Sequence, residues 1–133
     1  MLGLLDAKLG NIGAIKNIYD DLNIEYISIS KPDQINNITK LIIPGIGSFD
    51  SIINKLNENN LFDRINEFVT DEKKPVLGIC IGMHIFYEQS DEGINKGFGW
   101  IKDKIVKLNS KGVRYPHMGW NKINSLYSIL IFN

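Results

Sequence analysis

The amino-acid sequence predicts a single α/β domain whose largely parallel sheet is covered by helices on both faces. Short apolar runs typical of buried strands alternate with segments whose apolar residues recur at helical spacing. Prolines and glycines separate these segments, and a length of 133 residues suits one domain with one core. Parallel α/β sheets bind ligands at the carboxyl ends of their strands, so Asp6, Gly45 and Cys80, which end predicted strands, are candidate site residues.

The first third of the chain supplies three predicted strands. Residues 2–5 form the first strand, and the turn at Gly10-Asn11 leads into a helix. Residues 26–29 form the second strand, Pro32 opens a short helical turn, and residues 40–43 form a third strand. The apolar stripe of the helix, which should face the sheet, comprises Ile12, Ile15, Ile18, Tyr19 and Leu22.

The rest of the chain changes character at Gly97. Helical periodicity predicts helices over 49–56 and 61–69, followed by an apolar strand from Pro75 and a helix from Ile81 to Tyr87. After Gly97 the pattern predicts only short β segments, at 100–108, 119–123 and 127–132. Because an apolar strand at the chain end leaves a sheet edge uncovered, the domain is expected to be incomplete at its C-terminal end.

Composition excludes several classes of function. The 15 basic and 15 acidic residues are dispersed, so we expect no nucleic-acid partner and no anionic membrane surface. Neither a signal peptide nor a membrane-spanning run is predicted, and the single cysteine fits a reducing cytoplasm. One cysteine and two separated histidines lack metal-ligand spacing, and no phosphate-binding glycine loop follows the first strand, so we expect no metal and no cofactor.

Cys80 is the leading candidate for chemistry. It lies at the boundary between the apolar strand and the following helix, with Gly78 two residues before it and Gly82 two residues after it. A nucleophile elbow needs small residues at those two positions so that strand and helix approach closely. Backbone N–H groups at the helix start favour a thiolate. The alternative is that Cys80 is a small buried apolar residue, which is the usual role of a lone cysteine.

A second candidate is the segment Pro44-Gly45-Ile46-Gly47, which follows one strand and precedes a helix. Free N–H groups in such a turn suit an oxyanion hole. Alone, the segment fits a glycine-rich turn without a ligand better than an oxyanion hole. Next to a nucleophile on a neighbouring strand end, it would supply the donor that cysteine acyl transfer needs.

Three blocks of sequence resemble the class I glutamine amidotransferases, whose domain is a flavodoxin-like three-layer α/β fold. The segments Pro44–Phe49 and Gly78–Met83 are similar to the oxyanion loop and nucleophile elbow of that family. The segment Pro116–Asn121 is similar to a block found mainly in HisH-type glutaminase subunits of imidazole glycerol phosphate synthase. The resemblance runs from the first strand to about Ile123.

The resemblance implies a glutaminase for histidine biosynthesis. The Cys80 thiolate would attack the side-chain amide of glutamine, form a glutamyl thioester and release ammonia to a HisF-like (β/α)₈-barrel synthase in a heterodimer. Substrate and oxyanion contacts would come from Gly45, Ile46, Gly47, Ile81, His84 and Glu92. Contacts with the barrel would come from Asn11, His117, Trp120 and Asn121.

Three departures from the family pattern bear on this interpretation. The usual Asp-Tyr-Gly-x-Gly-Asn after the first strand is Asp6-Ala7-Lys8-Leu9-Gly10-Asn11, and a substrate-holding glutamine is replaced by His84. The general-base histidine and its glutamate belong to a downstream His-Pro-Glu motif that this sequence lacks. Neither His84 nor His117 is a convincing substitute, so the chain alone is expected to be weakly active or inactive.

Two alternatives remain open at this point. The first is a glutaminase that feeds a sugar-aminating synthase for surface polysaccharide, which the altered Asp6–Asn11 segment and His84 would fit. The second is a non-catalytic remnant that docks on a barrel partner without hydrolysing glutamine, which the missing His-Pro-Glu motif would fit.

Overall fold

A parallel sheet organises the chain. The computed structural model describes residues 1–6, 8, 12–108, 112, 118–122 and 124. Four parallel strands lie in the order β2-β1-β3-β4, and the last residues of β3 and β4, Gly45 and Cys80, are register partners. The strands are β1 (Leu2–Leu5), β2 (Tyr26–Ile29), β3 (Lys40–Gly45) and β4 (Val76–Cys80). All four predicted strands are therefore confirmed.

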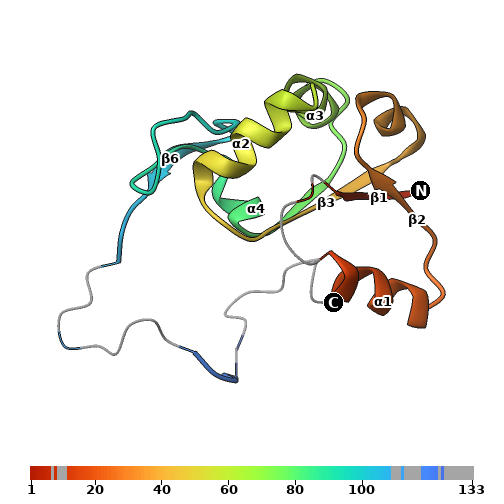
Figure 1. Cartoon of the computed structure of the whole chain (residues 1–133), viewed down its shortest axis with the longest axis horizontal. Coiled ribbons are helices and arrows are strands. Elements are labelled where there is room, and N and C mark those ends of the chain that lie inside the picture. The colour runs from red at the N-terminus through yellow and green to blue at the C-terminus, as the bar shows by residue number, and fades with distance from the viewer. Residues whose placement is uncertain (7, 9–11, 109–111, 113–117, 123, 125–133) are drawn as a thin grey trace.

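Helices lie on both sides of this sheet, with α2 and α3 on one side and α1 on the other (Figure 1). A second, two-stranded sheet pairs β5 with β6. The remaining elements are α1 (Gly13–Asp21), the short 3₁₀ helix η1 (Pro32–Asn37), α2 (Phe49–Glu58), α3 (Phe62–Thr70), α4 (Ile81–His84), β5 (Tyr87–Ser90) and β6 (Ile101–Ile105). The predicted α/β architecture is confirmed.

The core lies between the sheet and the α2–α3 side. Phe49, Leu56 and Phe68 are fully buried there against Leu41 and Ile43 of β3. Burial of one such aliphatic or aromatic side chain contributes about 1.5–3 kcal/mol. Because the core and the strand ends share β3, packing on this side fixes the position of Gly45.

The prediction that the first helix buries its apolar stripe is wrong for part of that stripe. No residue of α1 is fully buried, and the side chains of Ile18 and Leu22 are 56% and 62% exposed. Ile12, Ile15 and Tyr19 are half-buried. Within the described residues, α1 thus covers its side of the sheet only partly.

The prediction of a buried strand before Cys80 is also wrong. Among the described residues β4 is an edge strand, and the side chains of Leu77 and Ile79 are 44% and 42% exposed. An apolar run without alternation indicates burial on both faces only when strands flank it on both sides, and here only β3 pairs with β4.

The predicted helix over 81–87 ends at His84, and β5 begins at Tyr87. Tertiary hydrogen bonds explain the difference. The N–H groups of Phe98 and Ile101 donate to the carbonyls of Ile85 and Phe86, at 2.8 and 3.0 Å. These hydrogen bonds hold Ile85 and Phe86 in a turn that leads into β5, although residues 85–87 have a helix-compatible composition.

Aromatic stacking holds this second unit on α3. The rings of Phe62 and Phe98 stack at a centroid distance of 4.3 Å, and those of Phe98 and Trp100 at 4.2 Å. Trp100 Nε1–H also donates to Asn66 Oδ1 at 2.9 Å. The predicted segment 100–108 is confirmed as the shorter β6. No strand occurs at the described residues 118–122, while Ile123 and the predicted strand at 127–132 lie outside the described residues.

Gly82→Ala is expected to lower the free energy of unfolding by about 3 kcal/mol or more, as severe overpacking does. A Cβ at this position would lie 1.8 Å from the carbonyl oxygen of Ile43, which is backbone and cannot rotate away. The control is Gly47→Ala, where no atom lies within 4 Å of the added Cβ and only the positive φ of +119° opposes the change. We expect about 1 kcal/mol there. Urea denaturation measures both, and equal losses would contradict the steric explanation.

Candidate active site

Cys80 occupies a strained turn between β4 and α4. Its backbone has φ 56° and ψ −123°, a conformation that a residue with a side chain rarely adopts. Such strain costs about 1–3 kcal/mol and persists only where the surrounding structure imposes it. The thiol is exposed. A free thiol on a strained strand-to-helix turn is the geometry of a nucleophile elbow, and its exposure contradicts the alternative of a small buried cysteine.

The two flanking glycines provide the close packing that the sequence predicted. A Cβ on Gly78 would lie 2.5 Å from the carbonyl oxygen of Gly82, and one on Gly82 would overlap Ile43. A Cβ on Gly45 would lie 2.9 Å from the backbone nitrogen of Gly82. Three glycines from three elements therefore bring β3, β4 and α4 together directly at the cysteine.

The loop after β3 lies beside the elbow, because Gly45 is the register partner of Cys80. In this loop Gly47 has φ +119°, and the side chain of Ile46 is 63% exposed. Ser48 then caps α2, with its Oγ accepting from the N–H of Ser51 at 3.3 Å. The structure thus brings together the two segments that the sequence assigned to nucleophile and oxyanion hole.

A cavity of about 540 Å³ opens one helical turn beyond Cys80. Its lining includes His84 together with Glu92 and Lys107. Nδ1 of His84 is buried and has no hydrogen-bond partner among the described residues. The remaining lining residues are Asp91, Ile105, Val106 and Leu108. Two predicted substrate contacts, His84 and Glu92, therefore face a common cavity, while Ile81 is buried in the core behind it.

The charges around this cavity are partly compensated. Asp91 Oδ1 accepts from Lys104 Nζ at 2.8 Å, and Oδ2 accepts from the N–H of Lys107 at 3.1 Å. The Lys104 hydrogen bond, followed by that from Lys107, lowers the pKa of Asp91. Because the folded-state pKa is depressed, this stabilisation is present above the ordinary value of 3.8 and is lost as pH falls through the lowered pKa.

Other predicted residues are not drawn into the site. Asp6 pairs with Lys16 of α1 at 2.9 Å, so its role is to hold the helix. Trp120 and Asn121 are exposed, whereas Asn11 and His117 lie outside the described residues. Over the described part of the chain, no group hydrogen-bonds to the free thiol of Cys80, no cluster of side chains suits a metal ion, and no helix has the length and apolarity to cross a membrane.

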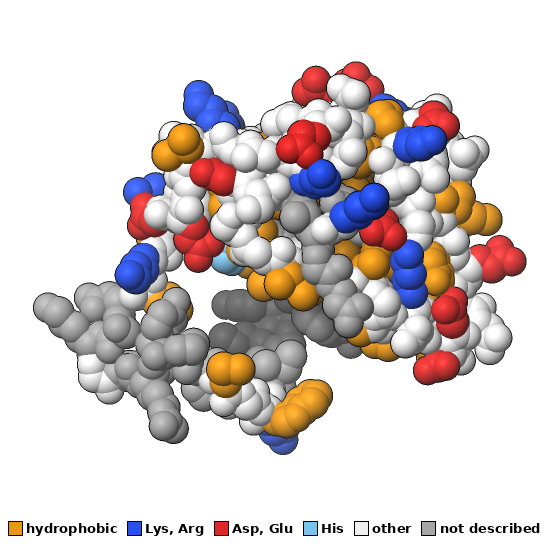
Figure 2. Space-filling view, viewed as in Figure 1, with side chains coloured by type: hydrophobic (Ala, Val, Ile, Leu, Met, Phe, Trp, Pro, Cys, Tyr) orange, Lys and Arg blue, Asp and Glu red, His pale blue; other side chains and the backbone are white. Residues whose placement is uncertain are grey.

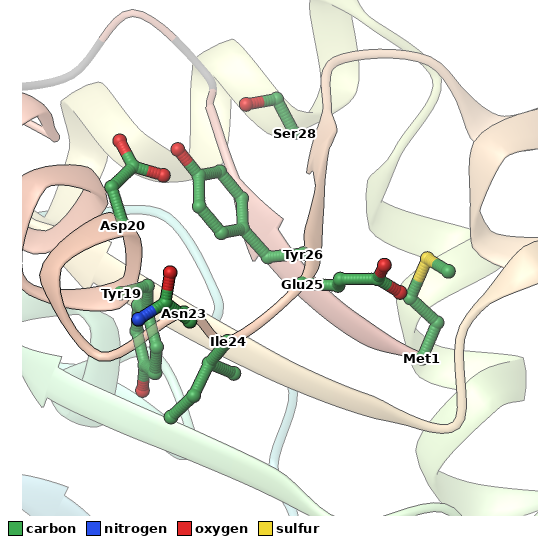
Figure 3. Close-up of a pocket in the computed structure, with 8 residues that line it drawn as sticks. All are labelled: Met1, Tyr19, Asp20, Asn23, Ile24, Glu25, Tyr26 and Ser28. Carbon is green, nitrogen blue, oxygen red and sulfur yellow. The ribbon is translucent and has the colours of Figure 1, made fainter.

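Two further cavities lie away from Cys80, at the amino ends of the strands. One of about 840 Å³ is lined by Met1, Tyr19 and Tyr26, with Asp20 close to the Tyr26 ring (Figure 3). Burial, followed by the Asp20 carboxylate, raises the pKa of Tyr26. The other, of about 630 Å³, lies between Tyr19 and the starts of β3 and β4. Neither is lined by Cys80 or by the loop after β3.

The surface agrees with the charge balance of the sequence. Figure 2 shows Lys and Arg side chains interspersed with Asp and Glu over the visible face, without a broad patch of one sign. Sequence reasoning missed Asp50, whose carboxylate accepts hydrogen bonds from the backbone of Ile94 and Asn95. An acidic residue in the first turn of a helix is common because it stabilises the helix dipole, so the sequence around Asp50 gave no signal of these contacts.

Comparison with known proteins identifies consistent relatives. The profile of the SNO glutamine amidotransferase family matches residues 2–116. Imidazole glycerol phosphate synthase subunit HisH 2 of Methanococcus maripaludis is 44% identical over 124 residues, covering 92% of this chain and 61% of that protein. The HisH subunit of Leptospira interrogans is 38% identical over 130 residues, covering 95% and 64%. The chain therefore spans less than two thirds of the length of these relatives.

A crystal structure of a glutamine amidotransferase superposes with a TM-score of 0.58 at 23% identity, covering 68% of this chain and 47% of that one. This likeness supports the fold.

The free energy of unfolding of Cys80→Gly is expected to exceed that of Cys80→Ala by about 1 kcal/mol. Both variants remove the thiol, but only glycine adopts φ 56° without strain. Chemical denaturation of the two proteins measures the difference. An alanine variant as stable as the glycine variant would show that the elbow is unstrained.

Proposed function

Because the chain belongs to the SNO glutamine amidotransferase family, we propose that it carries the nucleophile and oxyanion parts of a glutaminase site. The observation that carries the proposal is the pairing of Gly45 with Cys80, which sets a glycine-containing loop beside an exposed, strained cysteine. Acyl transfer requires both parts within reach of one carbonyl group, the nucleophile at its carbon and the N–H donors at its oxygen.

The proposed reaction starts with glutamine as substrate. The Sγ of Cys80 forms a bond to the amide carbon, and the carbonyl oxygen becomes an oxyanion that the N–H groups near Ile46 and Gly47 stabilise. The C–N bond then breaks and ammonia leaves. Water attacks the resulting thioester, releases glutamate and restores the thiol.

Glu92 and His84 would hold the rest of the substrate. Both line the same cavity, which His84 borders one helical turn after Cys80, and the carboxylate of Glu92 has the charge to accept the α-ammonium group of glutamine. Proton transfer needs a general base, and no described residue hydrogen-bonds to the Cys80 thiol. The His-Pro-Glu motif that carries the base in the resembled family does not occur in this sequence, so the proposal leaves the base unassigned.

The ammonia acceptor is proposed from the relatives, whose names describe subunits of imidazole glycerol phosphate synthase. The partner would be a HisF-like (β/α)₈-barrel synthase in a cytoplasmic heterodimer. Asn11, His117, Trp120 and Asn121 would face it. The complete exposure of Trp120 supports an interface there, since exposed tryptophans are frequent binding hot spots.

A docking module without activity is the second candidate. The lack of a base at Cys80 in the described part of the chain favours it. It would bind the barrel with no release of glutamate.

Cys80→Ser is expected to lower glutamine hydrolysis by several orders of magnitude, because the hydroxyl is a far weaker nucleophile than a thiolate. Glutamate release by the natural full-length protein with its barrel partner measures this. Equal turnover by the serine variant would contradict a Cys80 mechanism. Binding to the partner without any glutamate release from the unaltered protein would favour the docking module.

Trp120→Ala is expected to weaken binding to the barrel partner about tenfold or more, the effect of removing a hot-spot side chain. Ile94→Ala is a matched control, since its apolar side chain is 95% exposed but lies outside the proposed interface. Calorimetric titration of the partner gives both affinities. Equal affinities of the two variants would place the interface elsewhere.

A further inference from the structure

The loop that carries Glu92 is attached to the start of α2. Asp50 Oδ2 accepts from the N–H of Ile94 at 3.0 Å, and Asp50 Oδ1 accepts from the N–H of Asn95 at 2.9 Å. One turn later on α2, Asn54 Oδ1 accepts from Asn95 Nδ2 at 2.8 Å. Contacts across 41 to 45 residues of sequence thus fix the backbone two and three residues after Glu92.

The approach of this loop to Asp50 depends on Gly93. A Cβ on Gly93 would lie 2.2 Å from Asp50 Oδ1 and 2.7 Å from its Cγ. Only a residue without a side chain allows the carboxylate to reach the following N–H groups. The loop and the aspartate are therefore fitted to each other in direct contact.

The other side of the loop is held as well. The N–H of Asp91 donates to the Ile105 carbonyl at 2.9 Å, and the N–H of Glu92 donates to Ser90 Oγ at 3.1 Å. In the described part of the chain, no side-chain partner is found for the Glu92 carboxylate, which faces the cavity. The backbone around Glu92 is fixed, while its charge stays free for a ligand.

The same end of α2 also carries the loop beside Cys80. Asp50 lies three residues after Gly47 in sequence, and Ser48 between them caps the helix. One rigid helix end therefore bears the oxyanion loop and fastens the Glu92 loop. A shift of about 1 Å in such a constellation is enough to reduce a rate by a large factor.

We propose that Asp50 is a positioning residue that, with Asn54, fixes the Glu92 carboxylate relative to the oxyanion loop so that it binds the α-ammonium group of the substrate. This inference rests on the proposed function, because it takes glutamine as the ligand. It adds a residue that acts through Glu92 and does not itself touch the substrate.

The test uses two chloroketones that alkylate Cys80, the analogue of L-glutamine and the same compound without its α-amino group. In each labelling reaction, Sγ forms a bond to the methylene carbon and chloride leaves. The alkylation is complete after this one step, so it does not require the general base or the partner that glutamine hydrolysis needs. The natural full-length protein is labelled, and intact mass gives the rate constant for each compound. The ratio of the two rate constants isolates recognition of the amino group from the reactivity of Cys80.

The unaltered protein is expected to prefer the amino compound about tenfold or more, as for one charge-assisted hydrogen bond. Asp50→Ala should reduce this preference to about threefold or less, and Asp50→Asn, which keeps one acceptor oxygen, should give an intermediate ratio. Asn54→Ala should reduce the ratio without changing any charge. Glu58→Ala is the matched control, because it removes an exposed carboxylate from the other end of α2 and should leave the ratio unchanged.

The outcomes separate the two levels of the proposal. If the unaltered protein prefers the amino compound and Asp50→Asn, Asp50→Ala and Asn54→Ala keep that preference, the positioning role is overturned and the proposed function stands. If the unaltered protein shows no preference, or is not labelled at Cys80, the glutamine site itself is overturned. Asp50→Asn and Asn54→Ala keep the test decisive if Asp50→Ala fails to fold.

Discussion

The site depends on one steric constraint, the contact between Gly82 of α4 and the carbonyl of Ile43 in β3, where there is no space for a Cβ. Because the two backbones touch, α4 must begin immediately after β4, and the residue between them must adopt a positive φ. That residue is Cys80, so its thiol is directed out of the turn and remains exposed. The register of β3 with β4 then places Gly45 beside it. Strain at Cys80 is thus a consequence of close packing that the buried core around β3 stabilises.

Helix α2 connects the elbow region to the loop that carries Glu92. Its buried face, with Phe49 and Leu56, anchors it on the sheet, while its first turn is capped by Ser48 and accepts the Glu92 loop through Asp50. The second sheet is held independently on α3 by the stacked rings of Phe62, Phe98 and Trp100. The Glu92 loop is therefore attached to two helices of the same core. Such attachment keeps a loop residue in place, although loops in general are the more mobile parts of a fold.

Local patterns in the sequence were sufficient for the four parallel strands and for the elbow, because strand ends, glycines and a single cysteine are encoded by neighbouring residues. Features that depend on interactions between residues distant in sequence could not be predicted from such local patterns. Residues 85–87 have a helix-compatible composition, yet the helix ends at His84 and β5 begins at Tyr87, because Ile85 and Phe86 accept hydrogen bonds from Phe98 and Ile101. The burial of Leu77, Ile79 and Ile18 was overestimated. An apolar pattern shows which face of an element is hydrophobic, but it does not show whether another element packs against that face. Asp50 escaped detection for a related reason: its partners follow it by more than 40 residues.

The electrostatics of the cavity favour a zwitterionic ligand over an anionic one. Within the described residues, Asp91 is paired with Lys104, while no salt bridge involves Glu92 or Lys107, whose opposite charges belong to the lining of the same cavity. A phosphate or nucleotide would meet one unpaired carboxylate there, and repulsion would oppose its binding. A free amino acid carries an ammonium and a carboxylate on one carbon, so both cavity charges find a partner. The chain as a whole, with 15 basic and 15 acidic residues, adds no long-range field of either sign. Selection of the ligand therefore depends on these few groups, and on the backbone contacts that keep Glu92 in place.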